Sequence, residues 1–230
     1  NQVVYKDGSN NPAGSNTFIF NGTNVGIGTT SPSRKLTVLD TTSAAGNHFI
    51  GGGHINTTNG SFNYQTIVGG YNSTSSNRYT FIGGGRTHTA CGAWSTISGG
   101  YGNVAGGQIS VIAGGYGNSA TGCRSAVLGG QSNAATNIHA TIGGGIGNIA
   151  SGNCSAVAGG STNTAVGSYS FVGGGTGATA SGAYSTIGGG RSGKVCCDFG
   201  TVVGGADNVN CGYISAMNGG YNNCIFIGSS

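Results

Sequence analysis

The dipeptide Gly-Gly returns every fifteen residues between Tyr71 and Gly220, from Gly84-Gly85 to Gly219-Gly220. The spacing does not slip, so residues 71–220 divide into ten units of one length. A fixed period of this kind is typical of a solenoid, in which each unit is one coil that stacks on the next. We number the positions of a unit from 1 to 15, so that the paired glycines occupy positions 14 and 15.

Small and apolar residues recur two apart within each unit, which is the period of a strand. Position 3 is Asn in six units, position 5 is Ala in seven, position 7 is Gly in seven and position 10 is Ser in seven. We expect strands at positions 2 to 6 and 9 to 13, with turns at the position 7 glycine and at Gly-Gly. The predicted core is the apolar column at position 12: Ile82, Ile97, Ile112, Val127, Ile142, Val157, Val172, Ile187, Val202 and Met217.

A helical solenoid does not fit this composition. Two or three glycines in each unit would each cost a helix about 1 kcal/mol. The units also contain no proline, as expected where each coil donates its backbone N–H groups to a ladder. The sequence therefore predicts an all-β fold, a parallel β-solenoid or β-roll of fifteen-residue coils about 4.8 Å apart.

The core of such a coil is thin, because it holds one reliable large aliphatic side chain in fifteen residues. Ordering the backbone costs about 1 to 2 kcal/mol per residue, which a lone roll of this kind does not offset. The opposite face of the second strand is apolar, and a large apolar strip usually marks an interface. We therefore expect a homo-oligomer with an interface formed by Tyr79, Phe81, Trp94, Ile109, Phe171, Tyr184 and Phe199.

The rest of the chain divides around the array. Residues 1–42 lie outside the repeat and contain short strand-like runs, which indicate an N-terminal β module. Residues 43–70 form a transition with one seventeen-residue unit, whose extra residues we expect to bulge near Asn63, Tyr64 and Gln65. Residues 221–230 are a truncated terminal coil.

Charge is sparse, with eight basic and four acidic residues and a net charge of +4. Low charge and high Gly, Asn and Ser content would also suit a disordered chain, but the regular apolar column argues against disorder. The basic residues are scattered, which argues against a nucleic-acid partner. The chain contains no apolar run of about twenty residues, so the sequence predicts no insertion into a membrane.

Three of the seven cysteines, Cys91, Cys196 and Cys211, share position 6. Cys196 and Cys211 lie in adjacent coils, where equivalent Cα atoms about 5 Å apart could be bridged. We expect free buried thiols here, with a ladder disulfide as the alternative.

The sequence predicts no enzyme. Glycoside hydrolysis uses two carboxyl groups about 5 to 9.5 Å apart, and the chain has only Asp7, Asp40, Asp198 and Asp207. Asp198 and Asp207 fall at positions 8 and 2, which are different columns. The four histidines have no metal-ligand spacing with cysteines, so we expect no catalytic residue, metal or cofactor.

Binding of a ligand fits the residues at position 1 better than catalysis does. This column, on an edge of the predicted rod, holds Tyr71, Arg86, Tyr101, Tyr116 and Tyr221. Aromatic rings can stack on sugars, and a guanidinium group can pair their hydroxyls, so the column suits a glycan. The alternative is that these tyrosines pack between chains of the oligomer.

Two motifs resemble those of known fibres. Val25-Gly-Ile-Gly-Thr-Thr-Ser-Pro32, followed by Lys35-Leu-Thr-Val38, looks like a β module found in phage and large-virus tail fibres and in some bacterial adhesins. The repeat Ala-Ser-Gly-x-x-Ser-x-Ile-x-Gly is similar to the head repeat of trimeric autotransporter adhesins (YadA-like heads), whose coil is usually one residue shorter. These resemblances imply a homotrimer of left-handed β-rolls.

The expected function is thus non-enzymatic attachment, by an extracellular viral or phage fibre, to a host cell-surface glycan or protein receptor. The first alternative is a trimeric adhesin on a bacterial surface. The second is a purely structural fibre shaft.

Overall fold

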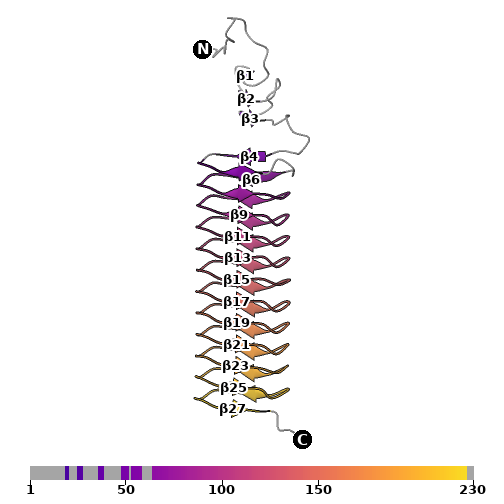
Figure 1. Cartoon of the computed structure of the whole chain (residues 1–230), viewed down its shortest axis with the longest axis vertical. Helices are drawn as coiled ribbons and strands as arrows, with labels where there is room; N and C mark the ends of the chain where they lie inside the picture. The colour runs from indigo at the N-terminus through magenta and orange to yellow at the C-terminus, as the bar shows by residue number, and fades with distance from the viewer. Residues whose placement is uncertain are drawn as a thin grey trace, which may run out of the picture.

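The computed structural model describes residues 19–20, 25–27, 36–38, 48–51, 53–58 and 64–226 of the chain. These residues contain strands and turns and no helix. Figure 1 shows short strands stacked like rungs along one long axis, from β4 near the N-terminal part to β27 near the C-terminus. The predicted parallel β-solenoid is confirmed.

Two twelve-stranded parallel sheets form the two sides of the rod. The first occupies positions 11 and 12 in the array and contains β4 (His48–Ile50), β6 (Gln65–Ile67), β8 (Phe81–Ile82), β10 (Thr96–Ile97), β12 (Val111–Ile112), β14 (Ala126–Val127), β16 (Thr141–Ile142), β18 (Ala156–Val157), β20 (Phe171–Val172), β22 (Thr186–Ile187), β24 (Thr201–Val202) and β26 (Ala216–Met217). The second occupies positions 4 and 5 and contains β5 (Thr57–Thr58), β7 (Thr74–Ser75), β9 (Thr89–Ala90), β11 (Val104–Ala105), β13 (Ser119–Ala120), β15 (Ala134–Ala135), β17 (Ile149–Ala150), β19 (Thr164–Ala165), β21 (Thr179–Ala180), β23 (Lys194–Val195), β25 (Val209–Asn210) and β27 (Cys224–Ile225).

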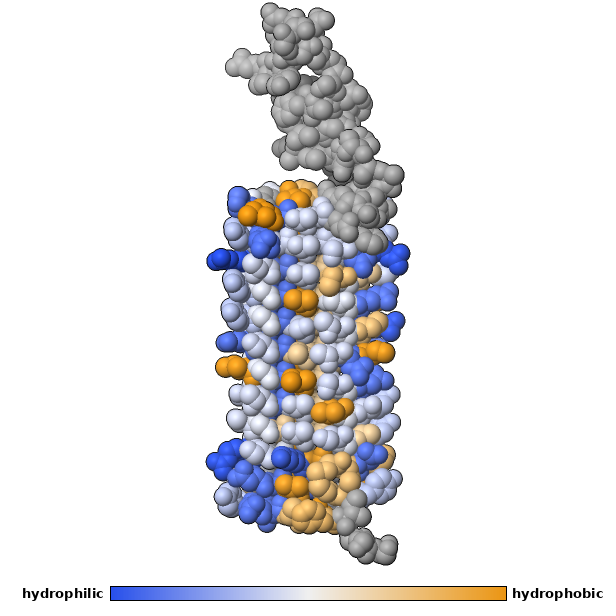
Figure 2. Space-filling view, in the orientation of Figure 1, coloured by the Kyte–Doolittle hydropathy of each residue, from blue (hydrophilic) through white to orange (hydrophobic). Residues whose placement is uncertain are grey.

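Each residue pairs with the residue one coil away. Thr96 pairs with Val111 in one sheet, and Val104 pairs with Ser119 in the other. Position 1 adds a third column of parallel bridges, which begins at the pair of His54 and Tyr71. Equivalent side chains therefore line up in columns along the rod, as the space-filling view shows (Figure 2).

The strands are shorter than predicted, because positions 2 and 9 adopt positive φ. Thr87 at position 2 has φ 55° and Trp94 at position 9 has φ 57°, a left-handed conformation that strands do not use. The backbone N–H of Trp94 donates back to the carbonyl of Arg78 (3.0 Å), whereas strand residues such as Thr96 donate forward. Position 9 therefore belongs to a turn, and its side chains are not on the outer face of the strand.

The core is a narrow double column. All ten position 12 side chains are buried, and the most exposed of them, Met217, is 7% exposed. Position 5 faces them with small side chains, such as Ala120 and Ala135, so the two sheets approach closely.

The buried asparagines at position 3 form a ladder. The Asn133 side chain donates to the carbonyls of Gly129 and Gly145, both at 3.0 Å, and its Oδ1 accepts the backbone N–H of Asn148 at 2.9 Å. The same arrangement repeats at Asn118, one coil earlier. Each side chain thus closes its own Gly-Gly turn and ties it to the next coil, which satisfies the polar atoms of a buried amide.

The two glycines of each pair differ. Gly130, at position 15, has φ 84°, and a Cβ atom there would lie 2.2 Å from the carbonyl oxygen of Gly145. Only glycine fits this position, because a side chain would collide with the next coil. A Cβ atom on Gly129, at position 14, would meet no atom within 4 Å. The coil itself therefore does not explain the glycine at position 14.

The N-terminal residues that the structure describes form a separate three-stranded sheet. It contains β1 (Ile19–Phe20), β2 (Val25–Ile27) and β3 (Leu36–Val38), with β1 antiparallel and β3 parallel to β2. Residues 1–18, with which the predicted N-terminal β module begins, lie outside the described residues.

The bulge expected in the seventeen-residue unit does not include Tyr64 or Gln65, and Asn63 lies outside the described residues. Gln65 begins β6 and is buried, and Tyr64 stacks on Tyr79 one coil away. Both residues therefore belong to the regular coil. The register places the two extra residues between Thr58 and Tyr64, outside the described residues.

Candidate functional site

The position 1 column forms a stacked ladder at the N-terminal end of the array. The Arg86 guanidinium lies between the rings of Tyr71 (5.2 Å) and Tyr101 (5.5 Å), and the Tyr101 ring stacks on Tyr116 at 5.1 Å. His54 continues the stack on the other side of Tyr71. The structure thus brings together four of the five residues predicted to bind a ligand.

Tyr221 is the fifth, and it lies at the other end of the rod. Its bridge partner at position 1 is Ala206, and seven coils separate it from Tyr116. It cannot share a small ligand with the ladder.

Stacking within the ladder limits what it can bind. The ring faces of Tyr71 and Tyr101 are covered by their neighbours, whereas a sugar that stacks on a tyrosine needs a free ring face. The ring edges and hydroxyl groups remain exposed to solvent. The ladder therefore offers a row of hydroxyls and one guanidinium edge, and a free ring face only at its ends.

A second set of ladders lies at position 9. Tyr64, Tyr79 and Trp94 stack near the N-terminal end of the array, with centroids 4.9 and 5.4 Å apart. A second group, Tyr169, Tyr184 and Phe199, stacks near the C-terminal end at 4.9 and 5.0 Å. The residues predicted for the interface are all exposed in the single chain, from 38% for Phe81 to 51% for Tyr184: Tyr79, Phe81, Trp94, Ile109, Phe171, Tyr184 and Phe199.

One face of the rod carries no charge. Positions 11, 13 and 14 hold only Gly, Ala, Ser, Thr, Val, Leu, Phe and one Asn in all ten units. Five of these side chains are large, apolar and exposed: Phe81, Val111, Leu128, Phe171 and Val203. We call positions 11, 13 and 14 together the uncharged face.

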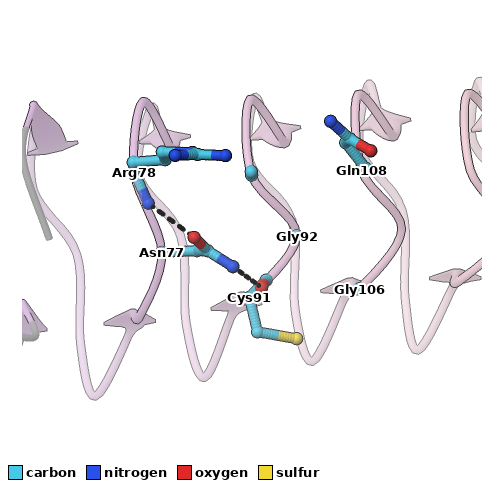
Figure 3. Close-up of a pocket in the computed structure, with 7 residues that line it drawn as sticks. Asn77, Arg78, Cys91, Gly92, Gly106 and Gln108 are labelled. Atoms are coloured by element: carbon cyan, nitrogen blue, oxygen red, sulfur yellow. Dashed lines mark hydrogen bonds between the residues drawn. The ribbon is translucent and has the colours of Figure 1, made fainter.

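A polar hollow of about 490 Å³ lies over positions 6 to 8 of neighbouring coils, at the turn between the strands of the two sheets. It is lined by Asn77, Arg78, Cys91, Gly92, Ala93, Gly106 and Gln108. Figure 3 shows the Arg78 side chain running along the rod toward the coil of Gln108, with the Cys91 sulfur pointing toward Gly106. Sequence reasoning missed this site. The sequence feature that could have revealed it is a pair of small residues, Ala93 and Gly106, each of which has longer side chains at the same position in the two neighbouring coils.

The acidic groups of the array make structural contacts. Asp207 accepts a hydrogen bond from Arg191 at 2.7 Å on the surface, and this bond raises the pKa of Arg191. Asp198 accepts the backbone N–H of Ala183 at 2.8 Å. Asp7 and Asp40 lie outside the described residues.

His88 is buried within the array. His88 takes the place of an asparagine at position 3, where its Nδ1 accepts the backbone N–H of Asn103 (3.2 Å). Burial lowers the pKa of His88. Among the described residues, no group of three or more His, Cys, Asp or Glu side chains could hold a metal ion.

The expectation of free buried thiols was wrong for one pair. Cys196 and Cys211 form a disulfide between adjacent coils, with Cα atoms 4.7 Å apart. Position 6 follows the inward-facing position 5, so its side chain points outward, and Cys196 is exposed. Cys91 remains a free, half-buried thiol.

The fold and its columns define the chain as a β-solenoid repeat protein. No protein-family model matches the sequence, and no curated protein is significantly similar to it. The part of the chain that the structure describes has no helix long and apolar enough to cross a membrane.

Proposed function

We propose that this chain is a non-enzymatic segment of a homotrimeric, extracellular fibre that attaches a virus or phage to the surface of its host. The observation that carries the proposal is the uncharged face, which is exposed or half-exposed along the whole array in the single chain. Two further chains packed against this face would bury its apolar side chains without burying a charge.

The size of the uncharged face suits a stable interface. Ten coils at about 4.8 Å and four strand residues at about 3.3 Å give a patch of about 600 Å². A standard interface buries about 800 Å² on each partner, and the bordering aromatic residues at position 9 enlarge the patch toward that value.

The glycines at position 14 support the same face. A Cβ atom on Gly144 or Gly159 would meet no atom of the chain within 4 Å, and neither residue has positive φ. A glycine that its own coil does not require fits a place where another backbone approaches closely. The resemblance of the repeat to trimeric adhesin heads points to three chains and to left-handed coils.

The attachment role is supported by the shape and by the surface chemistry. A rod of stacked coils is stiff, and it displays tyrosine hydroxyls, amides and, among the described residues, arginines that have no acidic partner. These groups pair well with sugars or with a protein receptor. The motif Val25-Gly-Ile-Gly-Thr-Thr-Ser-Pro32 resembles one found in tail fibres and in some bacterial adhesins, so it supports a fibre, and a bacterial surface adhesin is the first alternative. A shaft with no ligand is the remaining alternative, and its regular rod would look the same.

The mass of the folded chain in solution tests the trimer. We expect three times the chain mass of 22.3 kDa by light scattering. Gly159→Leu should lose the trimer and, because a lone roll does not offset the cost of ordering its backbone, much of the β circular dichroism spectrum as well. Ala134→Leu in the opposite sheet should keep both. A natural chain that is a folded monomer would refute the trimer.

A glycan array and cell-binding assays with the trimer test attachment. Saturable binding to a glycan or to cells supports the adhesive fibre. Binding to neither, by a chain that is a proven trimer, would favour the passive shaft.

A further inference from the structure

The hollow at positions 6 to 8 has a cationic wall without an acidic partner. The one ion pair among the described residues joins Arg191 to Asp207, while the Arg78 guanidinium contacts the ring of Trp94. The nearest carboxylate in the same column is Asp198, eight coils away, or about 38 Å at the coil spacing. The charge of Arg78 is therefore available to a ligand.

Arg78 is also held in place. Its guanidinium carbon lies 5.0 Å from the centroid of the Trp94 ring, in the next coil. Its backbone N–H donates to Asn77 Oδ1 at 2.9 Å, and the Asn77 amide donates to the carbonyl of Cys91 at 2.9 Å. These contacts orient the residue before a ligand arrives, which lowers the entropy cost of binding.

The space beside Arg78 arises from two small residues, Ala93 and Gly106. Position 6 holds Gly106, where the next two coils carry Thr121 and Thr136. Position 8 holds Ala93, between Arg78 in the preceding coil and Gln108 in the following one. A longer residue at either place would fill the hollow, so its volume is a local property of these coils.

The chemistry of the walls selects the ligand. A guanidinium group binds a carboxylate or a sulfate through two parallel hydrogen bonds. The Gln108 amide, about 9.6 Å along the rod at two coil spacings, can donate to and accept from hydroxyl groups. The absence of a side chain at Gly106, which is half-buried, lets a flat ring lie close to the coil.

We propose that this hollow binds an acidic saccharide, with the anionic group on Arg78 and sugar hydroxyls on Gln108. This proposal rests on the proposed attachment function, because it names the class of receptor that the fibre would bind. It places the binding site at residues outside the tyrosine ladder. The hollow lies over positions 6 to 8, outside the uncharged face. Three copies on one fibre would raise the apparent affinity of a shallow site.

Titration of the full-length chain with sialyllactose, with lactose as the neutral control, tests the site. We expect binding of sialyllactose at least tenfold tighter than binding of lactose. Arg78→Gln should remove that preference, and Gly106→Thr should weaken binding at least tenfold, because it fills the hollow with the residue of the next coil. Arg124→Gln, which removes an exposed arginine elsewhere on the rod, should change nothing.

Cys91 gives a second readout. Its thiol lines the hollow, so sialyllactose should slow its alkylation, as measured by mass spectrometry of the peptide, and leave Cys154 unaffected. A sulfated lactose that binds more tightly, in an Arg78-dependent way, would support the site and assign its anion to sulfate.

Equal binding of lactose and sialyllactose, or full binding by both Arg78→Gln and Gly106→Thr, would overturn the proposal. If Arg78→Gln also binds the glycan array as the natural chain does, attachment stands and the hollow does not serve it. If the natural chain binds no array glycan and no cell, the proposed attachment function is refuted. The titration with sialyllactose then still tests whether the hollow binds an acidic saccharide.

Discussion

The asparagine ladder makes a sharp prediction about stability. Asn133→Ala removes three hydrogen bonds, two donated to Gly129 and Gly145 and one accepted from the backbone N–H of Asn148. The carbonyl of Gly145 keeps a second donor, the N–H of Gln131, but the buried N–H of Asn148 loses its acceptor.

The cost can be estimated from these groups. An orphaned buried N–H costs about 1 to 3 kcal/mol, and each other lost bond about 0.5 to 1.5 kcal/mol, so we expect about 3 kcal/mol in all. Because solenoids open locally, the readout is amide hydrogen exchange in the coils around residue 133. At about 1.4 kcal/mol per factor of ten, exchange of the Asn148 amide should become about a hundredfold faster.

Two controls bracket this prediction. Gln131→Ala, an exposed neighbour, should leave the exchange rate unchanged. Ala178→Asn should extend the ladder, because its N–H already donates to Asn163 and its own amide could reach Gly174 and Gly190. We expect slower exchange in that coil. If Asn133→Ala speeds exchange of the Asn148 amide less than about tenfold, the ladder is not what secures the turns.

Two other predictions concern the columns. Gly160→Ala should unfold its coil, because the new Cβ would lie 2.2 Å from a carbonyl oxygen of the next coil. Gly159→Ala should lower the thermal midpoint much less, because its Cβ would meet no atom of its own chain within 4 Å and could disturb only the packing between chains; equal midpoints would refute this. Burial lowers the pKa of His88 in the folded state below its unfolded value of 6.5, because the neutral ring is favoured there. The free energy of unfolding should therefore be constant above pH 6.5 and decrease as the pH falls below it. Urea unfolding at pH 7.5 and 5 measures this loss, and His88→Asn, which restores the residue typical of the column, should remove it.

The sequence predicted the parts of the fold that one coil determines by itself. Apolar residues at position 12 and small ones at positions 5 and 10 fixed the inner side of each strand, because alternation along a strand has only two outcomes. The constant spacing then determined the register, since Ile97 can pair with Ile112 only if the coils are of equal length.

Other features depended on backbone geometry that residue types do not reveal. Position 9 accepts Tyr, Trp, Ile, Arg, His, Cys and Phe, none of which signals positive φ, so its turn was mistaken for part of a strand. The cost of that conformation, about 1 kcal/mol or more for each residue, is borne because hydrogen bonds to the preceding coil hold it. The outward direction of Cys196 was missed for a related reason, because burial had been inferred from residue type.

The candidate site was the hardest part to predict, because it depends on comparison between coils. A column of like residues stabilises the rod, as the Asn133 ladder does, and says little about a ligand. Information about a ligand lies where a column is interrupted, since an interruption costs packing that the repeat could otherwise have kept. Gly106 is the one residue without a side chain at position 6 of the array, and it lies near Ala93 and an arginine that has no acidic partner among the described residues. If a solenoid of this kind recognises a receptor, its specificity should lie in such interruptions, and regularising them should abolish binding while leaving the rod intact.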